Sequence, residues 1–140
     1  MKQLMTIAIA AILLAGVSTT AIAQSKVKKR YDYTLKNLRL DKKTEAQFAP
    51  VLKAYLDERK AAGDIYDDVK DKYKAAEKAG TLTDNQANQL LEAKIKSEEQ
   101  ELVVRRKYTT EFKKVLKPKK VYYALDLAND SMSKIEGKGE

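Results

Sequence analysis

The sequence predicts an all-α protein, an elongated hairpin of about four helices, two of them long. Apolar residues recur at intervals of three and four positions along most of the chain, which is the period of one helix face. The alternating pattern typical of strands is missing, and only two prolines and five glycines interrupt 140 residues. With 34% charged residues, the chain is expected to build a thin core and an extended or oligomeric shape.

The first 23 residues have the three-part pattern of a secretory signal peptide. Lys2 supplies a positive charge, residues 6–17 are mainly apolar, and Ala21-Ile22-Ala23 forms a small-residue cleavage site. The apolar run is short for a membrane span and no second run follows it. We therefore expect cleavage after Ala23 and export without a membrane span, to the periplasm in a Gram-negative cell. The expected organisation is a signal peptide (1–23), a single helical domain (24–132) and a flexible tail (133–140).

The composition excludes several function classes. The chain has no Cys and no His, which excludes disulfides, thiolate catalysis and histidine-based catalysis or metal ligation. No Gly-rich phosphate loop occurs, so we expect neither an enzyme nor a cofactor. Four aspartates at helical spacing could bind a hard cation, but such a row more often forms a solvated face, and no metal site is expected. They are Asp64, Asp67, Asp68 and Asp71.

The net charge of +8 indicates attraction to acidic partners. An exported protein meets little nucleic acid, so no nucleic-acid partner is expected. One basic cluster follows the cleavage site, and a second comprises Lys113, Lys114, Lys117, Lys119 and Lys120. Either cluster could bind acidic partners or simply form a solvated helix face.

The first two helices are expected at residues 26–38 and 42–79. Asp41 can cap the start of the second helix, and Gly80 ends it. The seam of the second helix advances in alternating steps of four and three, which predicts packing against an antiparallel helix of the same chain or another. That seam comprises Phe48, Leu52, Tyr55, Arg59, Ala62, Tyr66, Val69, Tyr73 and Ala76.

A third helix is expected at residues 84–116 and a fourth at 118–131. Thr83 with Gln86 fits a capping box at the start of the third helix, and Lys117-Pro118 stops it. The middle of the third helix is polar and is expected to pack weakly or to line a site. Its expected seam comprises Leu91, Ile95, Glu98, Leu102, Arg105, Thr109, Phe112 and Leu116.

The stretch Leu82-Thr83-Asp84-Asn85-Gln86 carries the LTxxQ motif, whose fixed residues are Leu82, Thr83 and Gln86. Together with the signal peptide and the long helix that follows, it makes the sequence resemble the Spy/CpxP family of periplasmic proteins. An upstream copy of the motif is degenerate, because residues 40–44 keep only the leucine. Three further stretches resemble a Bacteroidetes-type branch of the family: Phe48-Ala49-Pro50 with Tyr55, Lys107-Tyr108 with residues 112–116, and Lys120 with residues 123–126.

The resemblance implies an antiparallel homodimer that forms a curved cradle. It also implies an ATP-independent chaperone of the envelope-stress type, a holdase for unfolded or misfolded envelope proteins on an amphipathic, basic helical face. On the sequence, we predict the client-binding residues to be Tyr55, Arg59, Tyr66, Tyr73, Arg105, Arg106, Lys113 and Lys114. Plain packing between the two long helices is the alternative for at least half of the tyrosines.

The sequence does not decide between the holdase function and two others. The resemblance also implies a periplasmic regulator that docks on the periplasmic domain of an envelope-stress sensor, for which the basic cluster at residues 113–120 would serve as the docking surface. A structural helical protein of the envelope without client binding is the third possibility.

Overall fold

The computed structural model describes residues 20–137, and this part of the chain contains helices and no strand. The expected signal peptide lies outside it except for residues 20–23, which open the first described helix. The helices are α2 (Thr20–Leu38), α3 (Lys42–Ala79), α4 (Asp84–Lys113), α5 (Pro118–Ala128) and α6 (Met132–Ile135). The all-α class and the two long helices of the sequence prediction are confirmed.

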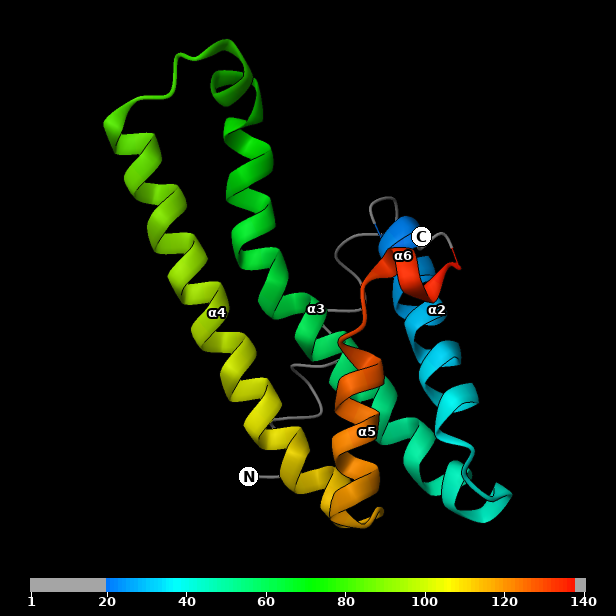
Figure 1. Ribbon diagram of the computed structural model, residues 1–140. Coiled ribbons are helices and arrows are strands. Elements are labelled where there is room, and N and C mark those ends of the chain that lie inside the picture. Colours follow the sequence, from blue (N-terminus) through cyan, green and yellow to red (C-terminus); the bar gives the residue numbers. More distant parts are fainter. Residues whose placement is uncertain (1–19, 138–140) are drawn as a thin grey trace.

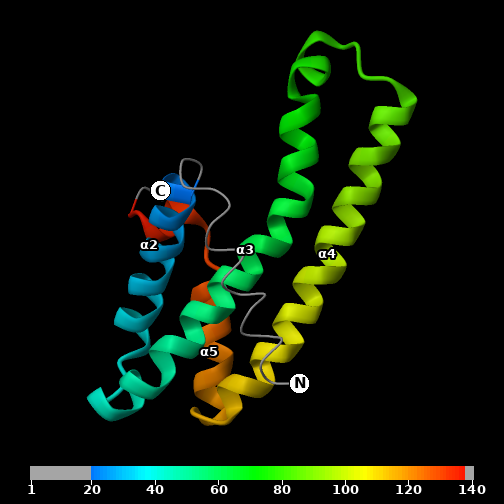
Figure 2. The same ribbon diagram turned by 180° about the vertical axis from the view of Figure 1, so that it is seen from behind.

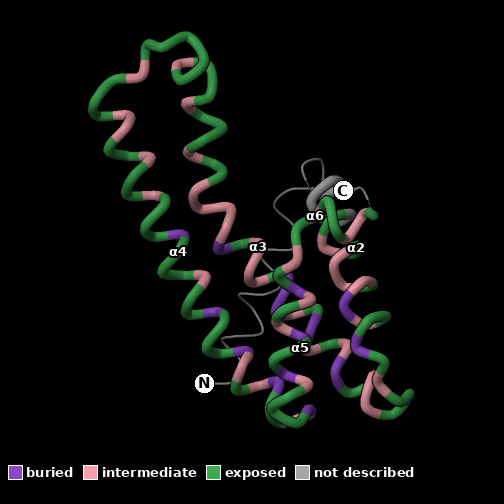
Figure 3. The backbone as a smooth tube through the Cα atoms, viewed as in Figure 1, coloured by how far each residue is buried: buried purple, intermediate pink, exposed green. Residues whose placement is uncertain are grey.

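The long helices α3 and α4 form an antiparallel hairpin (Figure 1). Helices α2, α5 and α6 pack beside the end of the hairpin that holds the start of α3, and the other end projects away from them in both views (Figures 1 and 2). Most buried residues accordingly lie at the packed end (Figure 3). None of the helices between residues 20 and 137 combines the length and apolar character that a membrane span requires.

Helix α3 has the predicted bounds because both of its ends are capped. The Asp41 side chain accepts a hydrogen bond from the Thr44 backbone N–H at 2.8 Å, and this bond lowers the pKa of the Asp41 carboxyl group. At the other end Gly80 adopts φ 68°, a conformation that favours glycine, and its N–H reaches the last carbonyls of α3.

Four predicted boundaries differ from the structure. Helix α2 begins at Thr20 rather than 26, so it contains the expected cleavage point after Ala23. Helix α4 ends at Lys113 rather than 116, because the chain turns there before Pro118 opens α5. Helix α5 ends at Ala128 rather than 131, and Asn129 forms its C-cap. The expected tail from 133 contains most of α6, which Ser131 caps and which an ion pair between Lys29 and Glu136 ties to α2.

Aromatic side chains fill the packed end of the hairpin. Phe48 and Tyr55 of α3 meet Tyr108 and Phe112 of α4, with ring centroids 4.9 Å apart for the two phenylalanines and 5.5 Å for the two tyrosines. The edge-to-face geometry of these pairs is the favourable one for aromatic rings. Burial raises the pKa of Tyr108, and the nearby Glu58 carboxylate raises it further.

Cationic side chains cap the carboxyl ends of α2 and α5. Arg30 of α2 and Arg59 of α3 both donate hydrogen bonds to the backbone oxygen of Ala128, at 2.7 and 2.9 Å. Lys120 of α5 donates in return to the backbone oxygen of Leu38, at 2.8 Å. Because helix C-termini carry unpaired carbonyls and partial negative charge, these contacts hold α2, α3 and α5 together.

Small residues bring α3 and α4 close together midway along the hairpin. Ala62 is 2% exposed, and the buried Ser97 hydroxyl donates to the Ala62 backbone oxygen at 2.7 Å. One residue further on, a Cβ on Gly63 would come within 3.4 Å of a Glu101 carboxylate oxygen. The face of α4 that carries Ser97 and Glu101 is therefore turned toward α3 at this point.

We predict that Ala62→Leu lowers the free energy of unfolding by about 1–3 kcal/mol, because the larger side chain would push the helices apart. Its neighbour Ala61 is exposed on the same helix, so Ala61→Leu should change stability by no more than about 0.5 kcal/mol. Urea unfolding followed by circular dichroism measures both. Equal stabilities of the two variants would show that the close approach does not constrain the hairpin.

Candidate functional site on the outer face of α4

The predicted seam of α4 is wrong over most of its length. Its first five members are exposed, and only Phe112 and Leu116, at its end, are buried. The buried residues of α4 are instead Ser97, Val104, Tyr108 and Phe112. The Ser97 hydroxyl on this face donates to the Ala62 backbone oxygen, which ties the face to α3.

The rotation of α4 leaves a row of large apolar side chains in solvent. Leu91, Ile95 and Leu102 are 61%, 57% and 45% exposed. At 3.6 residues per turn they lie within about 40° of one another around the helix axis, so they form one line, which we call the α4 stripe. Val103, 57% exposed, lies beside it. An exposed apolar row of this kind is a candidate surface for another molecule.

Charged side chains border the α4 stripe on both sides. Glu98 and Glu99 lie on the amino-terminal side of Leu102, and Arg105 and Arg106 lie on its carboxyl-terminal side. All four are exposed, and none of them takes part in the ion pairs formed between side chains of residues 26–137. They are therefore available for a partner of opposite charge.

The predicted basic client-binding residues are the ones nearest this surface. Arg105 and Arg106 are exposed beside the α4 stripe, and Lys113 is exposed on the same side of the helix two turns further on. Lys114 is also exposed but pairs with Glu111 at 2.9 Å. The structure thus places Arg105, Arg106 and Lys113, which were predicted to bind clients, beside the α4 stripe. The sequence analysis had assigned the apolar residues of that stripe to helix packing.

Two of the other predicted client-binding residues belong to the fold instead. Tyr55 is 1% exposed in the aromatic cluster and therefore cannot contact a client in this conformation. Arg59 is half-buried and donates to the backbone oxygen of Ala128, so the prediction of a client contact is corrected there as well. Beside it, burial lowers the pKa of Arg30, and the charge of Arg59 lowers it further.

Tyr66 and Tyr73 lie in the projecting part of the hairpin and stay half-buried. The Tyr73 hydroxyl donates to the Gln89 side chain across the two helices, and the Lys70 ammonium lies 5.8 Å from the centre of the Tyr66 ring. Tyr73 thus links α3 to α4, whereas the Tyr66 contact lies within α3, and both rings stay partly exposed.

The LTxxQ motif forms the start of α4. The Thr83 hydroxyl accepts from the Gln86 backbone N–H at 3.2 Å, and the Gln86 side chain accepts from the Thr83 N–H at 3.0 Å. This is the predicted capping box, and it is confirmed. Leu82 is half-buried next to it. In this chain the motif residues stabilise the hairpin turn.

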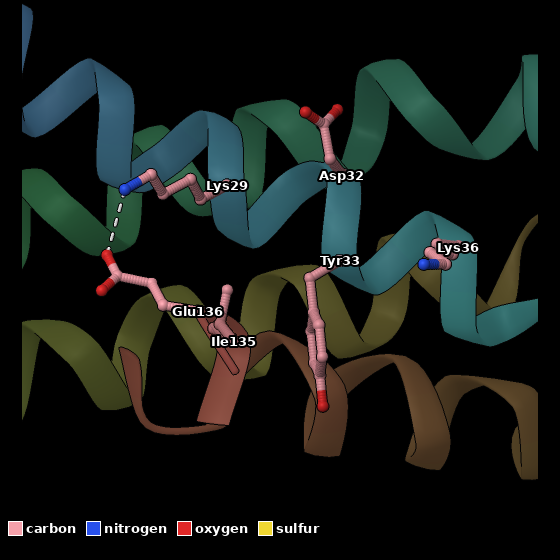
Figure 4. A pocket seen from close by; sticks show the side chains of 6 residues that line it. All are labelled: Lys29, Asp32, Tyr33, Lys36, Ile135 and Glu136. Carbon is pink, nitrogen blue, oxygen red and sulfur yellow. Dashed lines mark hydrogen bonds and ion pairs between the residues drawn. The ribbon is translucent and has the colours of Figure 1, made fainter. Parts of the chain in front are cut away.

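The hollows on the described part of the surface are weaker candidates than the α4 stripe. One of them, beside α2 and α3, is lined by charged side chains that include Arg30 and Arg59, and both of these already donate to the Ala128 oxygen. Six residues line an open hollow between α2 and α6 (Figure 4): Lys29, Asp32, Tyr33, Lys36, Ile135 and Glu136. Their side chains point in different directions, and Lys29 is tied to Glu136. Among residues 26–137 no three acidic side chains form a metal-sized cluster, and Asp64 of the aspartate row pairs with Lys60.

Val103 and an exposed tyrosine pair on α5 were missed by the sequence prediction. Tyr122 and Tyr123 are 67% and 44% exposed, and their rings contact each other at 5.7 Å. The sequence did contain a signal for the true packing face of α4: the Ala62-Gly63 pair on one helix and Ser97 on the other mark a close helix approach.

No protein-family model, curated protein or solved structure matches this chain.

We predict that Thr83→Ala lowers the free energy of unfolding by about 1 kcal/mol, because α4 loses its N-cap. Thr110→Ala is the matched control, since that exposed hydroxyl bonds only within its own helix, to the Arg106 oxygen. Urea unfolding should therefore separate the two variants. If both variants unfold at the same urea concentration, the motif has no capping role.

Proposed function

We propose that this protein is an ATP-independent holdase that binds unfolded envelope proteins, exported to the periplasm and without enzymatic activity. The observation that carries the proposal is the exposed α4 stripe next to unpaired arginines. Apolar side chains at 45–61% exposure offer contacts to the apolar segments that unfolded chains expose. The resemblance to the Spy/CpxP family, based on the LTxxQ motif, supports the same function.

The electrostatics of the surface suit transient capture. Arg105, Arg106 and Lys113 carry long cationic side chains beside the apolar row. Their charges attract acidic segments and raise the association rate, an effect that added salt screens. The apolar contacts lie on one helix face without an enclosing pocket, so binding depends little on client sequence.

We predict that replacing the apolar row by Leu91→Ser, Ile95→Ser and Leu102→Ser removes client protection. If each side chain contributes about 1 kcal/mol, client affinity falls on the order of a hundredfold. The three positions are exposed, so helicity and stability should stay close to those of the parent. Light scattering of an aggregating client without ATP, at increasing ratios of the chain from Gln24 onward, measures the loss.

The matched control is the pair Tyr122→Ser and Tyr123→Ser, which removes exposed aromatic surface from α5 and leaves α4 unchanged. This control should protect clients as well as the parent does. Equal loss in both variants would mean that general surface apolarity, rather than the α4 stripe, holds clients. No protection by the parent against several unrelated clients would refute the holdase function.

The second candidate function is a regulator that docks on a sensor domain. It is favoured by the corner between α4 and α5, where Lys113, Lys117 and Lys119 are exposed next to the Tyr122–Tyr123 pair. Lys120 and Lys114 of the same cluster are already bound, to Leu38 and Glu111. Cations beside exposed tyrosines suit an acidic protein surface.

For this second function we predict that Lys117→Glu with Lys119→Glu abolishes capture of envelope sensor domains in a pull-down. The same variant should keep the client protection of the parent, because both lysines lie outside the α4 stripe. Loss of client protection together with sensor capture would assign one surface to both functions.

A further inference from the structure

Charge is distributed unevenly along the molecule. The turn between α2 and α3 and the turn between α4 and α5 lie at the same end in both views (Figures 1 and 2), and Lys120 donates to the Leu38 oxygen between them at 2.8 Å. Residues 36–45 and 111–120 at this end, which we call the basic end, carry nine cationic and three acidic side chains, a net charge of +6. Residues 64–101, the projecting half of the hairpin, carry six cationic and ten acidic side chains, a net charge of −4.

Most cations of the basic end are exposed and free of ion pairs. Lys114 pairs with Glu111, and Lys120 is bound to a backbone oxygen. The other seven are exposed and take no part in the ion pairs formed between side chains of the described part of the chain. They are Lys36, Arg39, Lys42, Lys43, Lys113, Lys117 and Lys119. Their charge is therefore available to a large anionic partner.

Two exposed tyrosines border the basic end. Tyr122 and Tyr123 are 67% and 44% exposed, and Lys119 lies on the same side of α5, three and four residues before them. Asp126, the only acidic residue of α5, lies one turn further from the basic end. Tyrosine is enriched at membrane–water interfaces, where its ring lies among the lipid headgroups and its hydroxyl stays hydrated. Exposed tyrosines next to unpaired lysines thus suit a lipid headgroup layer.

We propose that the basic end docks on the surface of an anionic phospholipid bilayer. Each Lys or Arg near such a surface adds to the attraction. The seven unpaired cations come from the end of α2, the start of α3 and the turn between α4 and α5. A bilayer presents a wide plane of negative charge, so cations from separate turns can reach it together without a fixed spacing. An acidic protein would have to match the position of each one, and the distribution of the cations therefore favours lipid.

The acidic half of the hairpin determines the orientation of the docked molecule. An anionic surface repels residues 64–101, so the molecule attaches by its basic end and the hairpin points away from the lipid. Leu91 and Ile95 of the α4 stripe lie in that projecting half. Docking therefore goes beyond both proposed functions and leaves this part of the stripe uncovered.

Vesicle co-sedimentation tests the docking. The chain from Gln24 onward should sediment with vesicles of equal parts phosphatidylglycerol and phosphatidylcholine, and should not sediment with vesicles of phosphatidylcholine alone. Raising the salt concentration from about 0.05 M to about 0.5 M should release most of the bound protein, because salt screens the attraction. Absence of binding to the phosphatidylglycerol vesicles at low salt refutes the proposal.

Charge reversal tests the assignment to the basic end. Lys42→Glu with Lys43→Glu should lower the affinity for phosphatidylglycerol vesicles at least about tenfold. Both residues lie in the first turn of α3, where acidic side chains favour the helix, so the variant should fold. The matched control, Lys94→Glu with Lys96→Glu, makes the same change in net charge at exposed positions of the projecting half and should bind as the parent does. Equal losses in the two variants would assign binding to the overall charge and overturn the proposal.

A fluorescent probe tests the orientation. The chain has no tryptophan, so Tyr122→Trp introduces a single one beside the basic end. Its emission should shift to shorter wavelength when phosphatidylglycerol vesicles are added, because the ring enters the headgroup layer. Leu91→Trp, at an exposed position of the α4 stripe, is the matched control and should keep its emission. A shift at residue 91, or none at residue 122, overturns the orientation.

The outcomes separate this inference from the proposed functions, because client protection and sensor capture are both measured without lipid. A parent that binds the vesicles but protects no client refutes the holdase function alone. A parent that captures a sensor domain but binds no vesicles assigns the basic end to an acidic protein and refutes the docking on lipid.

Discussion

The contact between Ser97 and Ala62 determines how α4 is rotated, and the proposed binding surface depends on that rotation. A buried hydroxyl that donates to a backbone oxygen at 2.7 Å fixes both the distance and the register of the two long helices. Turning α4 by one residue would bury part of the α4 stripe, but it would remove the Ser97 hydroxyl from the Ala62 oxygen. The hairpin thus keeps its closest helix contact and leaves Leu91, Ile95 and Leu102 in solvent.

The basic residues of the chain divide into a structural set and a free set. Arg30, Arg59 and Lys120 donate to carbonyl oxygens at the ends of α5 and α2, where the backbone lacks helical partners. Arg105 and Arg106 have no such acceptor and stay exposed. Part of the high net charge of this protein therefore serves helix capping.

The sequence predicted most of the fold because local signals determine it. The bounds of α3 follow from Asp41 and Gly80, and the start of α4 follows from Thr83 with Gln86. The packing face of α4 was not predicted, because a search for large apolar residues favours Leu91 and Leu102 over Ser97. The prediction that Arg59 binds clients was wrong for a similar reason. Its hydrogen-bond acceptor, the backbone oxygen of Ala128, lies 69 residues away in the sequence and has no local sequence signal.

An exposed apolar row carries a risk of open-ended association, and the charges around it limit that risk. Four exposed charges, those of Glu98, Glu99, Arg105 and Arg106, flank Leu102, so an apolar surface can cover this part of the stripe only if its own charges are complementary. The charges next to the α4 stripe therefore restrict which surfaces can cover it.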